Sequence, residues 1–203
     1  MNIAVITGEH GFREKDFDAV FQSMVGIEFV REDMDDFVDD PKQQDYDTVV
    51  FYNFHRPYPT EPQAQAILDL SVRGQGIVIL HHAILAYPDW DVYSEICGIS
   101  DRDDFDYFPK QTLQVQVTDP THPITKDLSN WEMVDETYTM KSAGEDSTVL
   151  LSVDHPNSMD VIGWTREYGN SRVFCLQSGH DNRTYSHPNF HEVLRRGILW
   201  CAK

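Results

Sequence analysis

Hydrophobic positions in the first half of the chain form short runs that alternate with helical patterns. The run at residues 47–53 is almost wholly apolar, as in strands that are buried on both faces. The predicted elements, in chain order, are a strand at 2–7, a helix at 17–24, strands at 27–30 and 47–53, a helix at 60–72 and a strand at 76–80. This alternation of strand and helix implies an α/β fold with a parallel, doubly wound sheet.

The second half of the chain is richer in strands. Leu113, Val115 and Val117 alternate with glutamines, which predicts a strand with one face in water. Apolar residues of the segment 189–201 share one stripe, which predicts a closing helix that packs on the sheet. Further strands are predicted at 148–153, 159–165 and 172–177. Since no linker or repeat divides the chain, residues 1–203 are expected to form a single domain.

The composition fits a folded domain and excludes one class of partner. Of the 203 residues, 40% are hydrophobic, which is enough for a sizeable core. The net charge is −18, from 16 basic and 34 acidic residues, and such a charge repels phosphate backbones, so no nucleic acid is expected as a partner. Two acidic clusters, at 32–40 and 101–106, are interpreted as solvated loops.

Cysteine usage and apolar run lengths bear on location. Cys97, Cys175 and Cys201 are odd in number and share no CxxC spacing, so neither a disulfide framework nor a zinc-finger pattern is expected. The N-terminal apolar run has no basic segment before it and is interpreted as a strand rather than a signal peptide. No apolar stretch reaches the length of a membrane span. We expect a cytoplasmic protein without a membrane partner.

Histidines follow several predicted strands, at the end where open parallel sheets bind ligands. His81 and His82 come directly after the strand at 76–80, His180 follows the strand at 172–177, and His10 and His55 follow the first and third strands. Imidazole serves near neutral pH as a metal ligand, a general acid or base, and a hydrogen-bond donor. The sequence therefore predicts one histidine-lined pocket. Which of His81 and His82 faces it stays open, as does a purely structural role for both.

Carboxylates near these histidines extend the hypothesis. Asp135 and Glu136, close to Tyr138, are the best candidates, because a carboxylate with two or three histidines is a ligand set for zinc, iron or manganese. A surface hairpin with ordinary charges is an equal alternative. Asp181 either orients His180 or caps the following turn. Neither a phosphate loop nor a GxGxxG motif is present, so no nucleotide cofactor is expected.

Five ordered motifs resemble one family. They are GIVILHHA at 76–83, THPIT at 121–125, DETY at 135–138, GWTREYG at 163–169 and GHD at 179–181. In this order, and over nearly the whole chain, they resemble the ThuA-like (trehalose utilisation) family of the class I glutamine amidotransferase-like superfamily. The resemblance implies a flavodoxin-like three-layer sandwich with a mostly parallel central sheet.

The resemblance also implies a role in the metabolism of trehalose or related disaccharides and their keto forms. In glutamine amidotransferases the fourth strand ends in a nucleophilic cysteine, and here His81 takes that place. Without a thiolate there is no nucleophile for glutamine hydrolysis, so amidotransferase activity is not expected. Many relatives have a Phe-x-x-His stretch further on, whereas residues 104–109 contain no histidine. The substrate is expected to differ accordingly.

We therefore expect a metal-dependent hydrolase or isomerase that acts on a disaccharide or keto-sugar. The expected ligands of zinc, manganese or iron are His81, His180 and Glu136, which with Asp181 are also the expected catalytic groups. The expected contacts of the small-molecule carbohydrate are His10, Asn53, His55, Arg56, His82 and Tyr138. A non-catalytic sugar-binding or regulatory protein, and a structural subunit with a vestigial pocket, are the alternatives, since fold alone does not decide function. A homo-oligomer is left open.

Overall fold

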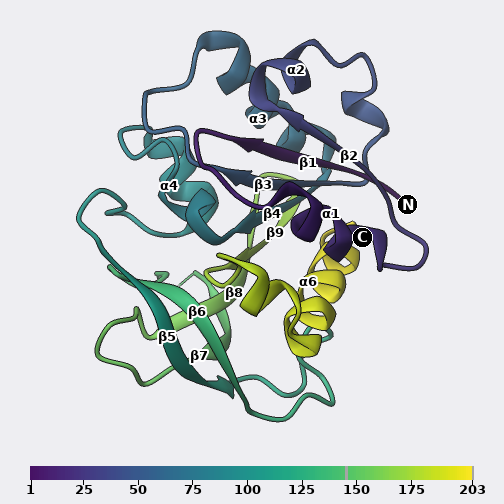
Figure 1. Ribbon diagram of the computed structural model, residues 1–203. Coiled ribbons are helices and arrows are strands. Elements are labelled where there is room, and N and C mark those ends of the chain that lie inside the picture. Colours follow the sequence, from purple (N-terminus) through teal and green to yellow (C-terminus); the bar gives the residue numbers. More distant parts are fainter. Residues whose placement is uncertain (145, 203) are drawn as a thin grey trace.

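The computed structural model describes residues 1–144 and 146–202, in which one nine-stranded sheet has the order β2-β1-β3-β4-β9-β8-β7-β5-β6 (Figure 1). Its strands are β1 (Asn2–Gly8), β2 (Glu28–Asp33), β3 (Thr48–Asn53), β4 (Gly76–Leu80), β5 (Asp106–Val117), β6 (Trp131–Thr139), β7 (Thr148–Ser152), β8 (Val161–Tyr168) and β9 (Ser171–Leu176). The α-helices are α1 (Glu14–Gln22), α2 (Met34–Asp39), α3 (Glu61–Arg73), α4 (Asp91–Cys97), α5 (Asn182–Tyr185) and α6 (Pro188–Cys201). Two 3₁₀ helices are η1 (Gln43–Asp45) and η2 (His81–Leu85).

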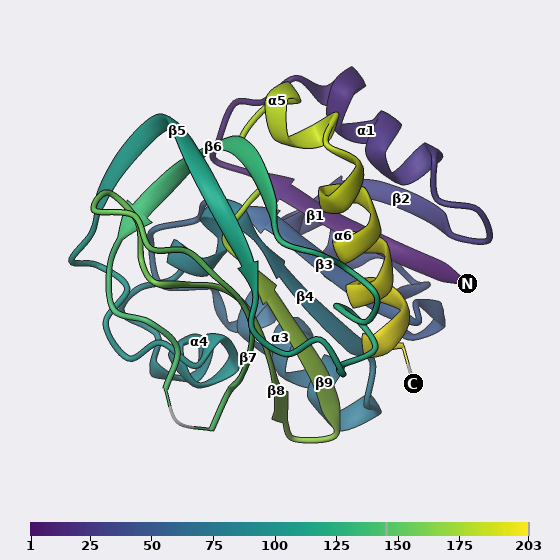
Figure 2. The same ribbon diagram turned by 90° about the horizontal axis from the view of Figure 1, so that it is seen from below.

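One half of the sheet is parallel and lies between two layers of helices. Strands β2, β1, β3, β4 and β9 pair in parallel, and every residue of β3 and β4 is buried. Helices α1, α5 and α6 cover one face, and α2, α3 and α4 cover the other (Figure 2). The doubly wound arrangement predicted from the alternating pattern is confirmed in this half.

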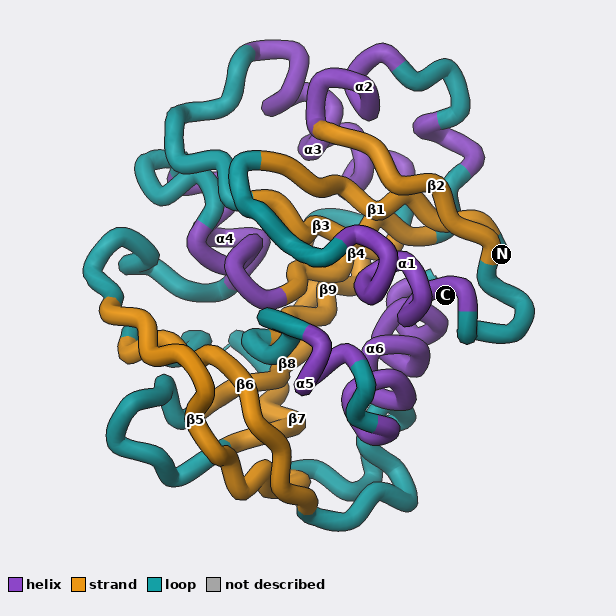
Figure 3. Tube along the Cα trace, viewed as in Figure 1, coloured by secondary structure: helices purple, strands orange, loops and turns teal. Residues whose placement is uncertain are grey.

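The other half of the sheet is antiparallel, so the expectation of a mostly parallel sheet is wrong and the sheet is mixed. Antiparallel pairs join β9 to β8, β8 to β7, β7 to β5 and β5 to β6. Figure 3 draws these strands in orange. The connections explain the change. Only Gly169 and Asn170 separate β8 from β9, whereas a parallel crossover needs about a dozen residues or more.

Local sequence accounts for most of the element boundaries. The α3 helix begins with a capping box between Thr60 and Gln63 and ends at Gly74, whose φ of 74° suits glycine. The prediction of a solvated loop at 32–40 is wrong, because Asp33 caps α2 by accepting a hydrogen bond from the backbone N–H of Asp36. The apolar side chains Met34 and Phe37 of α2 are buried.

The structure also shows the state of the cysteines and the character of the helices. Cys97, Cys175 and Cys201 are free thiols, and all three are buried. Within residues 1–144 and 146–202, none of the helices has both the length and the apolar character needed to cross a membrane.

Candidate functional site

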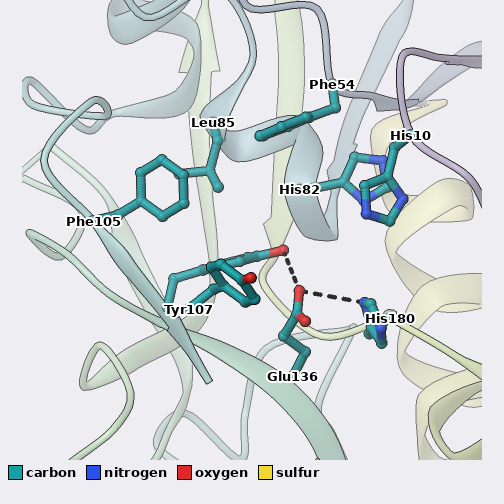
Figure 4. Close-up of a pocket in the computed structure, with 9 residues that line it drawn as sticks. His10, Phe54, His82, Leu85, Phe105, Tyr107, Glu136 and His180 are labelled. Atoms are coloured by element: carbon teal, nitrogen blue, oxygen red, sulfur yellow. Dashed lines mark hydrogen bonds and ion pairs between the residues drawn. The ribbon is translucent and has the colours of Figure 1, made fainter. Parts of the chain in front are cut away.

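A pocket of about 410 Å³ lies at the carboxyl ends of β1, β3, β4 and β9, where β6 and the start of β5 close it (Figure 4). Its lining residues are His10, Phe54, His82, Leu85, Phe105, Tyr107, Glu136, Tyr138 and His180. Figure 4 shows the side chains of Glu136 and His180 on one side of the pocket, and those of Phe54, Leu85 and Phe105 on the opposite side.

His81 occupies the sharp turn between β4 and η2. Its φ is +55°, a left-handed conformation that costs free energy in any residue other than glycine. The ring is fully buried, and its Nδ1 lies 2.8 Å from the carbonyl oxygen of Gln177. Because a carbonyl only accepts, Nδ1 carries a proton, which leaves Nε2 as the nitrogen that can bind either a cation or a second proton.

Nε2 of His81 is one of three possible metal-ligand atoms that lie close together. His81 Nε2 lies 3.3 Å from His180 Nδ1 and 3.6 Å from Glu136 Oε1, and His180 Nδ1 lies 3.3 Å from Glu136 Oε1. Tetrahedral zinc with bonds of about 2.0–2.2 Å places its ligand atoms roughly 3.3–3.6 Å apart. The donor types and the spacing of this cluster therefore fit a divalent cation of the first transition row.

The same cluster can hold a proton in place of a cation. When His81 Nε2 also carries a proton, burial opposes ionisation of Glu136, but hydrogen bonds from His180 and His81 outweigh it and bring the pKa of Glu136 well below its ordinary value. The hydrogen bond to Glu136 outweighs burial at His180 and raises the pKa of that imidazole. A carboxylate thus stays ionised beside His180, which holds its proton to higher pH than a free histidine.

Tyr138 supplies a hydroxyl to the cluster. Its oxygen lies 2.9 Å from His81 Nε2 and 3.3 Å from Glu136 Oε1. Burial, and then the negative charges of Glu136 and Asp135, raise the pKa of Tyr138 well above its ordinary value. The phenol therefore stays protonated at neutral pH and can donate one hydrogen bond, either to a cluster atom or to a bound ligand.

Asp135 ties the two segments that carry Glu136 and His180. Its carboxylate is 2% exposed and accepts backbone N–H bonds from Glu136 (2.9 Å), Gly179 (2.8 Å) and His180 (3.1 Å). Strands β6 and β9 are four places apart in the sheet, so no ladder bond holds their ends together. The buried carboxylate performs this task instead.

His82 and His10 form a neutral wall beside the cluster. Their rings stack with centroids 4.2 Å apart, and His82 Nε2 lies 3.1 Å from the carbonyl of Tyr52. Burial, and then the neighbouring His81, lower the pKa of both rings. The choice that the sequence left open is thus resolved, because His82 lines the pocket while His81 points Nε2 into the cluster.

Three expected carbohydrate contacts lie outside the lining. Asn53 is fully buried with its Nδ2 3.0 Å from His55 Nδ1, and the His55 ring stacks on Tyr87. Arg56 forms an ion pair with Asp103. These residues lie at the end of β3 as expected, but each is engaged by a protein partner, and none of them lines the pocket.

Asp181 caps the helix that follows it, which is one of the two roles that the sequence left open. It caps α5 by accepting a 2.8 Å bond from the backbone N–H of Arg183, and it pairs with the Arg183 guanidinium. The expectation that it orients His180 is corrected, because the carboxylate that holds the His180 ring is Glu136. A side chain next to a strand end can point either way, and helix capping draws this one away from the pocket.

Sequence reasoning missed the apolar lining at Phe54, Leu85, Phe105 and Tyr107. Phe54 and Leu85 lie close in sequence to predicted site histidines, and Phe105 falls in the acidic segment 101–106. Apolar residues beside a site resemble core residues in sequence, because only the fold shows that they face a cavity.

Comparison with known proteins gives a consistent result. A family model described as ThuA, trehalose utilisation, matches residues 2–201, whereas no curated protein matches the chain. A ThuA-like protein from Parabacteroides merdae has a TM-score of 0.81 and 21% identity, with 100% of this chain and 90% of that chain covered. A ThuA-like protein from Bacteroides uniformis has a TM-score of 0.78 and 22% identity, with 99% and 91% covered.

A solved structure with a lower TM-score has a similar fold and comes from outside the ThuA-like proteins. The structure described as PurLQS from Thermotoga maritima has a TM-score of 0.63 and 16% identity, with 100% of this chain and 99% of that chain covered. This likeness supports the expected glutamine amidotransferase-like fold. At such identities the solved structures show a shared fold alone.

Proposed function

The chain belongs to the ThuA (trehalose utilisation) family, and from that premise we propose that it is an enzyme that acts on a disaccharide or keto-sugar with a divalent cation. The observation that carries the proposal is the triangle of His81 Nε2, Glu136 Oε1 and His180 Nδ1, with edges of 3.3–3.6 Å. Glu136 and His180 line a pocket that is large enough for a small sugar, and the buried His81 completes the triangle from beneath the lining.

The roles proposed for His81, Glu136 and Tyr138 follow from their contacts. A bound divalent cation polarises a carbonyl or lowers the pKa of bound water, which suits either enolisation or hydrolysis. The carbonyl of Gln177 keeps a proton on Nδ1 of His81, so Nε2 is the nitrogen that faces the cation, and Glu136 stays ionised and offers its oxygen atoms. The hydroxyl of Tyr138 stays protonated and is the donor for a substrate oxygen beside the cluster.

Glutamine amidotransferase activity is not part of the proposal. His81 occupies the turn after β4 where the thiol nucleophile of amidotransferases is expected, and all three cysteines of the chain are buried. An assay of ammonia release from glutamine should give no turnover above background. The free thiols agree with the proposed cytoplasmic location, since a reducing compartment keeps cysteines unpaired.

Elemental analysis of protein purified without chelator tests the cation. Near-stoichiometric zinc, manganese or iron is expected in the native protein, and a loss in His81→Ala and in His180→Ala. His122→Ala is the matched control, because His122 packs against Trp200 and lies outside the pocket. Native protein that binds none of the three ions after exposure to each of them would contradict the proposed metal site.

Turnover separates an enzyme from a sugar-binding protein. In a screen of keto-sugars with the cation present, Glu136→Gln should lower kcat by about 100-fold or more, since it removes a group that binds the cation or transfers a proton. A ligand that binds equally well to native protein and to Glu136→Gln, with no turnover in either, would favour the non-catalytic sugar-binding alternative.

A further inference from the structure

One wall of the pocket offers a ligand almost no polar side-chain group. Phe54, Leu85 and Phe105 form this wall, and Tyr107 stands at its edge with 63% of its surface exposed. In Figure 4 the wall lies across the pocket from Glu136 and His180. The pocket is therefore polar at one end and apolar at the other.

Arg56 assembles this wall from three separate segments. Its Nη1 donates a 2.6 Å hydrogen bond to the carbonyl of Leu85. Its guanidinium carbon lies 5.6 Å from the ring centroid of Phe54 and 5.5 Å from that of Phe105. The same guanidinium pairs with Asp103, two residues before Phe105. One side chain thus contacts all three members of the wall and anchors the loop that carries Phe105.

The charges of the residues that line the pocket narrow the class of ligand further. Among the described residues that line the pocket there is no lysine or arginine, and Glu136 is an acid. At the apolar end a phosphate or carboxylate would therefore find no lysine or arginine in the lining to pair with, since the nearby Arg56 is already paired with Asp103. The ligand that fits is uncharged at the apolar end.

Hydrogen bonding argues against a second sugar ring at the wall. Hydroxyls turned toward Phe54, Leu85 and Phe105 would lose their bonds to water and find no side-chain partner. A planar apolar group loses nothing by leaving water and can stack on the two phenyl rings. The volume of about 410 Å³ suits a ligand of about two rings.

We propose that the Phe54–Leu85–Phe105 wall is a subsite for the aromatic aglycone of a glycoside or keto-glycoside whose sugar ring faces Glu136, Tyr138 and His180. The sugar end rests on the function proposed above, and the subsite favours the keto-sugar branch of that proposal over the disaccharide branch, because the wall takes an aryl group in place of a second sugar ring. Arg56 is the positioning residue of the subsite.

The test compares ligands that differ only at the aglycone. Phenyl and methyl D-glucopyranosides, each as the α and the β anomer, are titrated calorimetrically into the full chain with zinc present. For the anomer that binds, the phenyl compound should bind at least about tenfold more tightly, because its ring leaves water for an apolar wall.

Single-residue variants test whether the preference for the phenyl compound comes from the apolar wall. Phe105→Ala and Arg56→Gln should reduce the phenyl-to-methyl ratio to about twofold or less and leave the methyl affinity unchanged. Arg73→Gln is the matched control, since Arg73 has similar side-chain exposure (32% against 30% for Arg56) and also pairs with an aspartate, away from the pocket. If Arg56→Gln does not fold, Phe105→Leu decides, because it keeps an apolar side chain but removes the ring.

The outcomes separate this subsite from the proposed function. Equal binding of phenyl and methyl compounds, or binding of neither, in protein that takes up zinc overturns the subsite and leaves the metal site standing. A phenyl preference that Phe105→Ala abolishes, in protein that takes up no metal, supports the subsite and removes the cation from the proposed function.

Discussion

At the scale of single residues, one backbone angle at His81 decides how two adjacent histidines are used. The φ of +55° turns the chain at the end of β4, so Nε2 of His81 meets Glu136 and His180 while His82 stacks on His10. Such a conformation costs about 1–3 kcal/mol outside glycine. The hydrogen bond to Gln177 and complete burial hold His81 in it.

Replacing Asp135 with asparagine tests the tie between β6 and the segment after β9. An amide nitrogen cannot accept a hydrogen bond, so at least one of the backbone N–H groups of Glu136, Gly179 and His180 loses its partner. We expect a loss of about 1–3 kcal/mol in the free energy of unfolding. Since two cluster residues shift with the tie, we also expect zinc affinity to fall by about 10–100-fold.

Urea unfolding and competitive zinc titration measure the two effects, with the exposed Asp160→Asn as control. A return of the His180 pKa toward its ordinary value, followed by NMR in metal-free protein, would show that Asp135 acts on His180, through its charge or through the tie, even when no cation is present. Lost stability with unchanged zinc affinity and unchanged His180 pKa would reduce Asp135 to a structural role.

Glu32 gives the stability of the protein a pH dependence remote from the pocket. Burial, and then the charges of Asp40, Asp36 and Asp33, raise the pKa of Glu32 to about 7. The folded state therefore prefers the protonated form, and this contribution, complete below the unfolded pKa near 4.5, is lost as the pH rises through about 7.

We expect Glu32→Gln to stabilise the protein at pH 8 by roughly 1 kcal/mol, a value reduced because the side chain is partly exposed and its charge is screened. Near pH 4 the native and variant proteins should unfold at the same urea concentration. A stabilisation that is equal at both pH values would show that the charge of Glu32 is not its source.

At the scale of elements, α6 packs on β9 through a glycine. A Cβ at Gly197 would overlap the ring of Phe174, which is fully buried and cannot move aside freely. Alanine favours a helix over glycine by about 1 kcal/mol, but overpacking a core costs about 1–3 kcal/mol. We expect Gly197→Ala to lower the free energy of unfolding, as measured with urea. Gly11→Ala, where a Cβ meets nothing within 4 Å, should be neutral or slightly stabilising.

Elements with an apolar run or a regular side-chain pattern were predicted, including β4 and β9, which precede the site histidines, whereas β6, which carries Glu136 and Tyr138, was not. The all-buried strands β3 and β4 and the capped helix α3 follow from apolar runs and end signals. Strand β6 was missed because Asp135, Glu136 and Thr137 are polar yet buried, which breaks the pattern of a strand. Local rules fail where a chain places polar groups inside for chemistry.

At the scale of the whole molecule, the cluster joins both halves of the sheet. Its donor atoms come from the turn after β4, from β6 and from the segment after β9. A cation that binds only the folded chain stabilises it by about 2.7 kcal/mol at a free concentration of 100 times its Kd. For a chain of this size we expect the Tm to rise by about 5–10 °C on adding zinc.

Differential scanning calorimetry with zinc and with a chelator measures this shift. His81→Ala should show no rise, because it removes one of the three donor atoms. A rise of equal size in the variant would assign the stabilisation to another group on the protein.

The sequence by itself determined the doubly wound half of the fold, the histidines at the strand ends and the family resemblance. These features follow from short-range signals, since periodicity, caps and apolar runs record the burial of each segment. It also named His81, Glu136 and His180 together, and their donor atoms lie within 4.8 Å of one another, although cation binding itself stays a proposal.

The tertiary structure alone decided the antiparallel half of the sheet, the tie made by Asp135 and the apolar wall that Arg56 assembles. Each depends on contacts between segments that are far apart in the chain. Such contacts leave no periodic trace in the sequence, because a residue that faces a distant partner has the same local pattern as one that faces the core or the solvent.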